Sequence, residues 1–397
     1  MDIKYFNTEL DNDIKIYDEK IIDIVSNLPA LKIVHDKELL DETYKAVNKF
    51  KLNKKKFILL GTGGSNLGAR ALHNINNYKN YNIEFYDNID PITLDKSFKH
   101  IDFKKTGFII ISKSGNTPET LAQFSSLYEI ASQTNNIDNF LSNILIITEF
   151  KDSALYNISR QKNCFMLEHN KNIGGRFSIF SNVGIVPAIL SGINISNLYS
   201  GVLEVTNNIK KYSALNLAKY LTMNENKKFR LSVAMTYSDN LYYFGKWYLQ
   251  LWAESIGKNN RGITPIHSVG TTDQHSQLQL YLDGPNDKFF TFITTNHSNK
   301  GTKINNEIFK KTNIDYLKDR TIGDLMQAEQ RATIETFKIN NFSFREIYLP
   351  KIDELNIGKL LALSIIETIS TCIYLDVNPF DQPSVEQGKI LTKKFLI

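Results

Sequence analysis

The chain has 397 residues, of which 42% are hydrophobic and 22% are charged, and its formal net charge is +5. These values are typical of a globular protein of about two domains, and they exclude collagen-like and disordered classes. No long basic arm is present, and 42 acidic residues accompany the 47 basic ones, which disfavours nucleic-acid binding. A mild positive balance does suit an anionic small substrate.

Targeting and redox features are few. No apolar run approaches the ~18–20 residues that a membrane helix needs, and the opening residues MDIKYF lack the apolar stretch of a secretory signal. The two cysteines, Cys164 and Cys372, lie far apart without CxxC spacing, which disfavours a disulfide framework and a cysteine zinc site. We therefore expect a protein of the reducing cytosol, with no membrane partner.

The first elements in chain order predict a parallel sheet. Residues 1–45 are expected to be polar and helical, without recognisable chemistry. Continuous apolar runs then occur at 57–60, 83–86, 108–111 and 144–147. Because these runs do not alternate with polar residues, they predict strands buried on both faces of a parallel sheet. Helical segments between them indicate a βαβ architecture.

The same pattern restarts past residue 200. Strands are expected at 231–235, 289–293 and 344–348. Helices are expected around 243–255, 274–282, 319–338 and 354–375, with a last one after Pro383. We therefore predict a helical segment at 1–45, a first α/β unit at 46–195, and a second at 196–397 with a helical extension.

Two polar loops follow predicted strands, at the edge where open α/β sheets bind ligands. In SKSGNTPET (112–120), Thr117 is a plausible N-cap and Pro118 a favoured first helical residue. Its backbone N–H groups and hydroxyls suit a phosphoester, although a simple capped helix fits equally well. GTGGSNLG (61–68) lacks the dinucleotide, P-loop and nucleophile-elbow patterns. Its glycines would let a sugar or phosphate approach the backbone, or would simply form a tight turn.

An arginine and a carboxylate are candidates for chemistry, although each taken alone favours a structural role. Gln250 and Glu254 are four residues apart, so they share one face of a helix whose end lies near Gly257. Arg176 precedes an unusually apolar helix at 179–190. It could bind a structural carboxylate or face an oxyanion.

The remaining polar candidates are weaker. His275 lies near the start of a predicted helix, and Lys389 lies in the terminal helix, where a lysine is normally solvent-facing. His267 and His297 lack metal-ligand spacing with any partner, so we expect no bound metal.

Six segments, taken in order, resemble the motifs of the glucose-6-phosphate isomerase family. They are GTGGSNLG at 61–68, SKSGNTPET at 112–120, GGRFS at 174–178, ESIGK at 254–258, QHS at 274–276 and NPFDQPSVEQGK at 378–389. The last segment is the most specific, and the resemblance covers most of the chain beyond residue 45. It implies a three-layer αβα sandwich of two flavodoxin-like sugar-isomerase (SIS) subdomains with parallel-rich sheets. The implied reaction is the reversible aldose–ketose exchange of glucose 6-phosphate and fructose 6-phosphate, with no cofactor.

The resemblance also implies roles for residues in these motifs. Glu254 resembles the base that moves a proton between C2 and C1, and Arg176 resembles the residue that faces the enediolate oxygens. His275 and Lys389 resemble the ring-opening pair, with His275 reaching the site from a second subunit of a homodimer. The implied phosphate- and sugar-binding residues are Gly64, Ser65, Ser112, Lys113, Ser114, Thr117 and Gln250.

Two alternatives stay open from the sequence. A phosphoglucose/phosphomannose isomerase would need only a relaxed sugar pocket that accepts both C2 epimers. A non-catalytic SIS regulator is disfavoured, since it would not need Glu254, Arg176 or Lys389. The chain is short for the family and has Ser-Gly-Asn at 114–116 where many members have Thr-Phe-Thr. Asp273 and Gln277 also depart from the usual histidine motif, which bears on sugar preference and dimer contacts.

Overall fold

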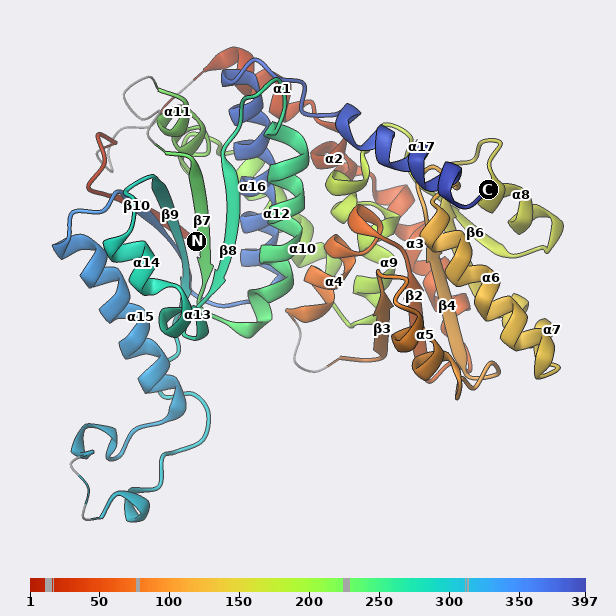
Figure 1. Ribbon diagram of the computed structural model, residues 1–397, viewed down its shortest axis with the longest axis horizontal. Coiled ribbons are helices and arrows are strands. Elements are labelled where there is room, and N and C mark those ends of the chain that lie inside the picture. Colours follow the sequence, from red (N-terminus) through yellow and green to blue (C-terminus); the bar gives the residue numbers. More distant parts are fainter. Residues whose placement is uncertain (11–15, 17, 76–78, 224–228, 311, 313) are drawn as a thin grey trace.

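Two five-stranded sheets stand side by side in the molecule (Figure 1). The computed structural model describes residues 1–10, 16, 18–75, 79–223, 229–310, 312 and 314–397. The first sheet has the order β3-β2-β4-β5-β6, and all its strands are parallel. They are β2 (Lys56–Leu60), β3 (Asn82–Tyr86), β4 (Thr106–Ile111), β5 (Ile144–Thr148) and β6 (Phe165–Glu168).

Helices cover both faces of the first sheet because the residues of β4 are apolar on both sides. Phe108 and Ile110 pack on one side with α5 (Pro91–Phe98), α6 (Pro118–Gln133), α7 (Ile137–Ser142) and α8 (Ala154–Gln161). Ile109 and Ile111 pack on the other side with α3 (Lys37–Phe50), α4 (Leu67–Asn74) and α9 (Asn182–Leu190). Successive strand residues face opposite ways, so this packing makes three layers.

The second sheet has the order β1-β10-β9-β7-β8, in which only β1 is antiparallel to its neighbour. Its strands are β1 (Asp2–Phe6), β7 (Leu231–Thr236), β8 (Thr264–Val269), β9 (Lys288–Thr295) and β10 (Phe344–Leu349). On one face, Phe290 and Phe292 pack with α14 (Leu278–Asp283) and α15 (Ile322–Ile339). The predicted three-layer α/β architecture with parallel-rich sheets is confirmed.

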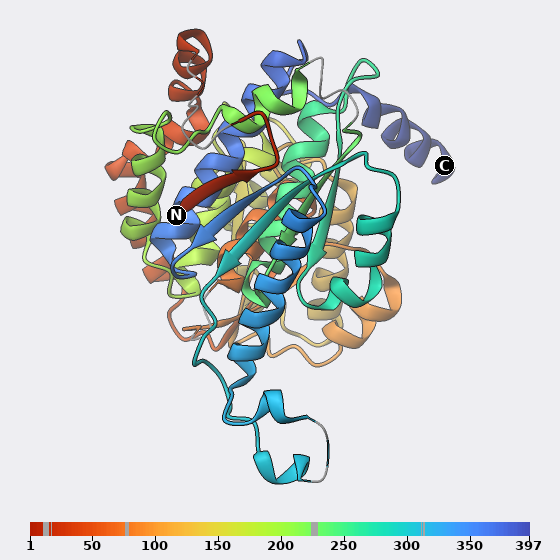
Figure 2. The ribbon, with the colours of Figure 1, turned by 90° about the vertical axis from the view of Figure 1, so that its left-hand side faces the viewer.

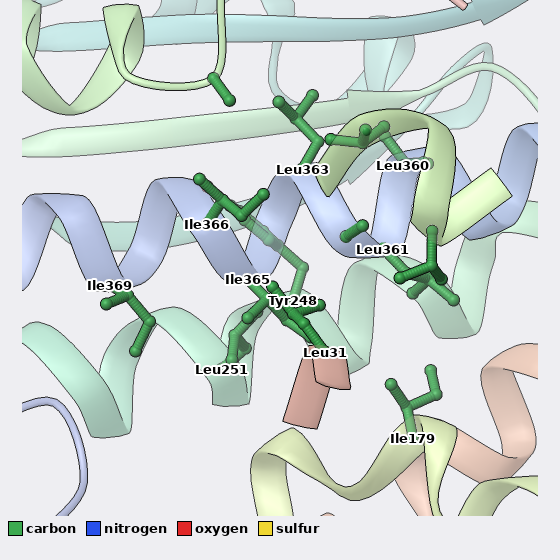
Figure 3. Packing of buried hydrophobic residues seen from close by; sticks show 14 of the residues in the cluster. Leu31, Ile179, Tyr248, Leu251, Leu360, Leu361, Leu363, Ile365, Ile366 and Ile369 are labelled. Atoms are coloured by element: carbon green, nitrogen blue, oxygen red, sulfur yellow. The ribbon is translucent and has the colours of Figure 1, made fainter. Parts of the chain in front are cut away.

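The other face of the second sheet carries the largest core. It packs against α10 (Ile195–Thr206), α11 (Asn216–Thr222), α12 (Tyr242–Ile256) and α16 (Glu354–Tyr374). Figure 3 shows Ile365 of α16 next to Tyr248 and Leu251 of α12. Helix α16 is long and apolar enough to span a membrane by composition, but 89% of its most apolar window is buried inside the protein. It is therefore the core helix of this layer.

Several sequence predictions need correction. Residues 1–45 are not purely helical, since β1 (Asp2–Phe6) pairs with β10, and helices α1 (Glu19–Ser26) and α2 (Pro29–Lys32) come later. The boundary between 45 and 46 falls inside α3. Strands β6 and β8 were missed, because β6 has only four residues, none of them buried, and β8 is mostly half-buried and contains Pro265. The division at 195 stays a prediction.

Helix boundaries also differ from expectation. The helix predicted at 274–282 is two helices, α13 (Thr272–Ser276) and α14, which meet at Gln277. The apolar helix predicted from residue 179 begins at Asn182, because Gly175–Phe180 forms a 3₁₀ helix, η3. The terminal helix is α17 (Glu386–Phe395). Figures 1 and 2 show that α17 and the segment around η6 (Asn306–Phe309) project from the body.

Candidate active site

The two polar loops predicted to bind ligand lie side by side at one edge of the first sheet. The 3₁₀ helix η2 (Gly63–Ser65) follows β2, and the loop at 112–117 follows β4. Because β2 and β4 are parallel neighbours, their carboxyl ends bring both loops to the same edge. This edge is where an open α/β sheet places its ligand.

Hydroxyls and backbone N–H groups shape the loop at 112–117. Ser112 is buried, and its Oγ lies 2.8 Å from Thr117 Oγ1. Gly115 has φ +69° and donates its N–H to both Ser112 O and Ser112 Oγ, each at 3.2 Å. Pro118 begins α6 as predicted, whereas the Thr117 hydroxyl makes no cap hydrogen bond. Ser114 is exposed at the tip, so the loop offers hydroxyls beside a positive helix end.

Lys113 does not point its ammonium freely from this loop. Its Nζ donates to Lys171 O at 3.0 Å and lies 3.5 Å from Glu149 Oε1. Burial would raise the pKa of the Glu149 carboxyl, but ion pairs with Lys151 and Lys113 hold it below its usual value. Lys113 therefore ties the loop after β4 to the segment that leads to Arg176, while its charge stays at the sheet edge. No sequence pattern pointed to Glu149.

The glycine loop lies directly against η3 and α12. A Cβ on Gly64 would come within 2.6 Å of Arg176 N, and it would overlap the carbonyl of Gly175. Gly63 has φ +53°, and a Cβ there would lie 2.8 Å from Gln250 Nε2. Neither position has space for a side chain, so these glycines permit close approach of the loop to η3 and α12. Ser65 is half-buried beside them.

Arg176, Glu254 and Gln250 form one hydrogen-bonded group. Arg176 is only 3% exposed, and its Nη1 lies 3.2 Å from Glu254 Oε2, whose side chain is 36% exposed. Gln250 Nε2 donates to Glu254 Oε1 at 2.9 Å, and Gln250 Oε1 is buried without a partner in the described part of the chain. Burial lowers the pKa of Arg176, and Glu254 opposes that shift. A fixed cation thus faces a partly exposed carboxylate.

The loop before α17 completes the surroundings of Arg176. Its Nη2 donates to Pro379 O at 2.5 Å and Asp381 O at 3.2 Å, and its Nη1 donates to Gln382 Oε1 at 2.8 Å. Its Nε donates to Ser255 Oγ at 2.9 Å. Ser255 and Gln382 were missed as site residues, although both lie inside recognised motifs (254–258 and 378–389).

His275 and Lys389 are not brought to this group within one chain. Lys389 Nζ pairs with Glu386 Oε1 at 2.6 Å on α17, all of whose residues are exposed. His275 is exposed on α13, which follows the carboxyl end of β8, whereas Glu254 lies in the last turn of α12 (Figure 1). No hydrogen bond or ion pair among the described residues joins either side chain to Arg176 or Glu254. The same residues contain no cluster of three His, Cys, Asp or Glu able to hold a metal.

Comparison with known proteins matches this chain to one family model. The model of phosphoglucose isomerase matches residues 38–396. The chain belongs to the phosphoglucose isomerase family. The probable glucose-6-phosphate isomerase of Methanococcus maripaludis is 35% identical over 99% of this chain and 89% of its own length. The glucose-6-phosphate isomerase of Campylobacter jejuni is 32% identical over 100% of this chain and 92% of its own.

Solved structures show the same fold. The crystal structure of a hypothetical protein from Thermus thermophilus superposes with a TM-score of 0.86 at 27% identity, covering 95% of this chain and 94% of that one. A tagatose-6-phosphate ketose/aldose isomerase from Escherichia coli gives a TM-score of 0.60 at 13% identity, over 94% and 98% of the two chains. The family model and the two isomerase relatives confirm the expected family, and the solved structures confirm the expected SIS-type fold.

Proposed function

We propose that this protein interconverts glucose 6-phosphate and fructose 6-phosphate by moving a proton between C1 and C2 of the open-chain sugar. Membership of the phosphoglucose isomerase family supports this reaction. The observation that carries the proposed mechanism is the 3.2 Å pairing of Glu254 with Arg176, which contacts the glycine loop at the sheet edge that also carries the loop at 112–117. A carboxylate and a fixed cation are what a proton transfer through an enediolate needs.

The loop at 112–117 is the proposed phosphate site. The hydroxyls of Ser112, Ser114 and Thr117 and the N–H groups at the start of α6 would donate to the phosphate oxygens. Lys113 contributes positive charge at the sheet edge rather than a free ammonium, because its Nζ is already bonded to Lys171 O. Gly64 and Ser65 are proposed to line the sugar.

Glu254 is the proposed base. Starting from the aldose, its carboxylate takes the proton from C2, the C2–H electron pair forms the C1=C2 bond, and the π pair of C1=O moves onto O1, which gives a cis-enediolate. The proton is then delivered to C1, and the hydroxyl hydrogen passes from O2 to O1, which leaves the ketose. The base must lie within about 3 Å of the carbons, and such positioned catalysis typically contributes ~10²–10⁴-fold.

Arg176 is proposed to stabilise the negative oxygens of the enediolate. The guanidinium group stays charged at neutral pH, so it can stabilise the oxyanion without losing a proton. Its N–H groups are occupied by Glu254, Gln382 and backbone carbonyls, so substrate oxygens would displace one of the side-chain acceptors. Gln250 would orient Glu254 through Nε2, and its Oε1, which has no partner among the described residues, can accept from a sugar hydroxyl.

Ring opening is assigned to His275 and Lys389. Histidine can exchange protons near neutral pH, and Lys389 could hold charge at the ring oxygen. His275 would act from a second copy of the chain, which makes the proposed active enzyme a homodimer, and α17 would approach the site with Lys389. We also propose a cytoplasmic location, in line with the two buried free cysteines.

A coupled assay of the purified protein on fructose 6-phosphate, with a chelator present, tests the proposed function. The proposal is supported if glucose 6-phosphate forms and the rate is unchanged by the chelator. Comparable turnover of mannose 6-phosphate would instead indicate a phosphoglucose/phosphomannose isomerase. Binding of the sugar phosphate without product would favour a non-catalytic regulator.

A further inference from the structure

The segment at 375–382, here called the tethered loop, connects α16 to α17 and is held by three cations from other parts of the chain. Arg261 donates to Leu375 O, and its side chain is half-exposed. Arg176 and Lys258 bind the loop farther along, and both are largely buried. The segment that leads into α17 is therefore held by side chains that belong to η3 and to the turn after α12.

Lys258 binds both the end of α12 and the tethered loop, through two hydrogen bonds and one ion pair. Its Nζ donates to Ser255 O at 2.9 Å and to Asn378 O, and it lies 3.1 Å from Asp381 Oδ1. Its side chain is 9% exposed. One of these three partners belongs to the last turn of α12, directly after Glu254, and the other two belong to the tethered loop. Lys258 thus joins the end of α12 to the loop that carries Gln382.

The same stretch of loop also binds Arg176. The carboxylate of Asp381 forms the ion pair with Lys258. The backbone O of Asp381 accepts a hydrogen bond from Arg176 Nη2 at 3.2 Å. Pro379 O and Gln382 Oε1 accept from the same guanidinium. Moving the loop would therefore move three of the acceptors that orient Arg176.

We propose that Lys258 is a positioning residue for the isomerisation. By fixing the tethered loop against the end of α12, it keeps the Arg176 guanidinium aligned with Glu254 and sets where α17 begins. This inference rests on the proposed function, since it assigns Lys258 to the same site. Lys258 touches no reacting atom, so it acts through Arg176 and Gln382.

The chain offers a matched control lysine. Lys288 is 5% exposed and donates to Pro285 O at 2.8 Å and to Asp287 Oδ1 at 2.7 Å. It therefore makes the same kinds of bonds as Lys258, but it makes them at the start of β9, with no bond to the tethered loop. Any general cost of replacing a buried lysine should appear equally in both variants.

The experiment compares Lys258→Met, Lys258→Arg and Lys288→Met in two measurements. In Lys258→Met we expect kcat on fructose 6-phosphate to fall about 10- to 100-fold while KM changes less, because small misplacement of catalytic groups is costly. Amide hydrogen exchange across 375–382 should become faster in that variant. Lys258→Arg should recover part of kcat, since it restores charge and donors, and Lys288→Met should match the wild type in both readouts.

Wild-type kcat in Lys258→Met, or lost kcat with unchanged exchange at 375–382, would overturn the inference. Amide hydrogen exchange can be measured without turnover, so it tests the role of Lys258 in holding the loop independently of activity. The proposed function would fail separately if the wild-type protein had no isomerase activity. If Lys258→Met does not fold, Asp381→Asn replaces it, because that carboxylate is 51% exposed. Faster exchange and lower kcat in Asp381→Asn then support the inference, and wild-type values overturn it.

Discussion

Nη1 of Arg176 lies 3.2 Å from Oε2 of Glu254, although the two residues are 78 positions apart in the chain. The arginine is 3% exposed and the glutamate 36%. The cation is therefore held by the protein, while the carboxylate has one side open. This asymmetry fits a base that meets a ligand in front of a fixed positive charge.

Glu254→Gln should lower kcat by about 10²–10⁴-fold, because the amide cannot take the C2 proton. Binding of fructose 6-phosphate should persist, since the 112–117 loop is unchanged. Steady-state kinetics and titration calorimetry measure the two effects. Glu335→Gln, on the exposed face of α15, is the control and should retain wild-type turnover. Near-normal kcat in Glu254→Gln would remove this residue as the base.

Gly115→Ala should weaken phosphate binding. Gly115 has φ +69°, and an added Cβ would overlap Ser153 Oγ, so the loop must shift. We expect KM for fructose 6-phosphate and the inhibition constant of inorganic phosphate to rise together. The double variant Gly115→Ala/Ser153→Gly removes the overlap but keeps the unfavourable φ, so it should recover part of the loss. Unchanged phosphate inhibition in the single variant would contradict this role for the loop.

The strands and loops of the first sheet could be predicted because their signal is local. Phe108 to Ile111 form an unbroken apolar run, and that run alone indicates a strand covered on both faces. Strand β1 could not be predicted this way. It contains both polar and apolar residues, and it forms because Asp2–Phe6 pairs with β10, more than three hundred positions away.

The candidate site shows the same limit. Motif resemblance pointed to Arg176 and Glu254, and the structure brings them together. The commitment of Lys113 to Glu149 depends on how the loops after β4 and β5 approach each other, which no local pattern encodes. The exposure of Lys389 depends on where α17 lies, and that is decided by tertiary contacts of the tethered loop.

Glu367→Gln should destabilise the fold without changing the chemistry. Arg345 on β10 and Glu367 on α16 are 2% and 1% exposed, and Arg345 Nη2 donates to Glu367 Oε2 at 2.9 Å. Breaking such a buried pair leaves an uncompensated charge and costs about 3–5 kcal/mol. Urea unfolding should show that loss, with kcat per folded molecule retained. Arg345→Met/Glu367→Leu should be closer to the wild type than the single variant, and equal losses would contradict the explanation.

The free energy of unfolding should fall as the pH drops from 6.5 toward 4, in part through His169. This residue is fully buried, its Nδ1 donates to Asn170 O at 3.2 Å, and burial lowers its pKa from 6.5 to about 4. In this window the unfolded chain binds the proton and the folded protein does not, so acid favours unfolding, by at most about 1.4 kcal/mol per pH unit for one group. Urea unfolding at several pH values should give a smaller slope for His169→Gln. His35→Gln, at an exposed position, should keep the wild-type slope.

Mixing two inactive variants should restore activity if His275 acts from a second copy of the chain. In a dimer of one Glu254→Gln subunit and one His275→Ala subunit, one site receives both lesions and the other receives neither. If equal amounts of the two variants are mildly denatured and refolded together, random pairing makes about half of the dimers mixed, and each mixed dimer has one intact site because the two sites are related by symmetry. The mixture should therefore show about a quarter of wild-type activity on the ring-closed substrate. If each site drew both residues from a single chain, every site in the mixture would carry a lesion. The mixture would then be no more active than the separate variants, and the shared site would be wrong.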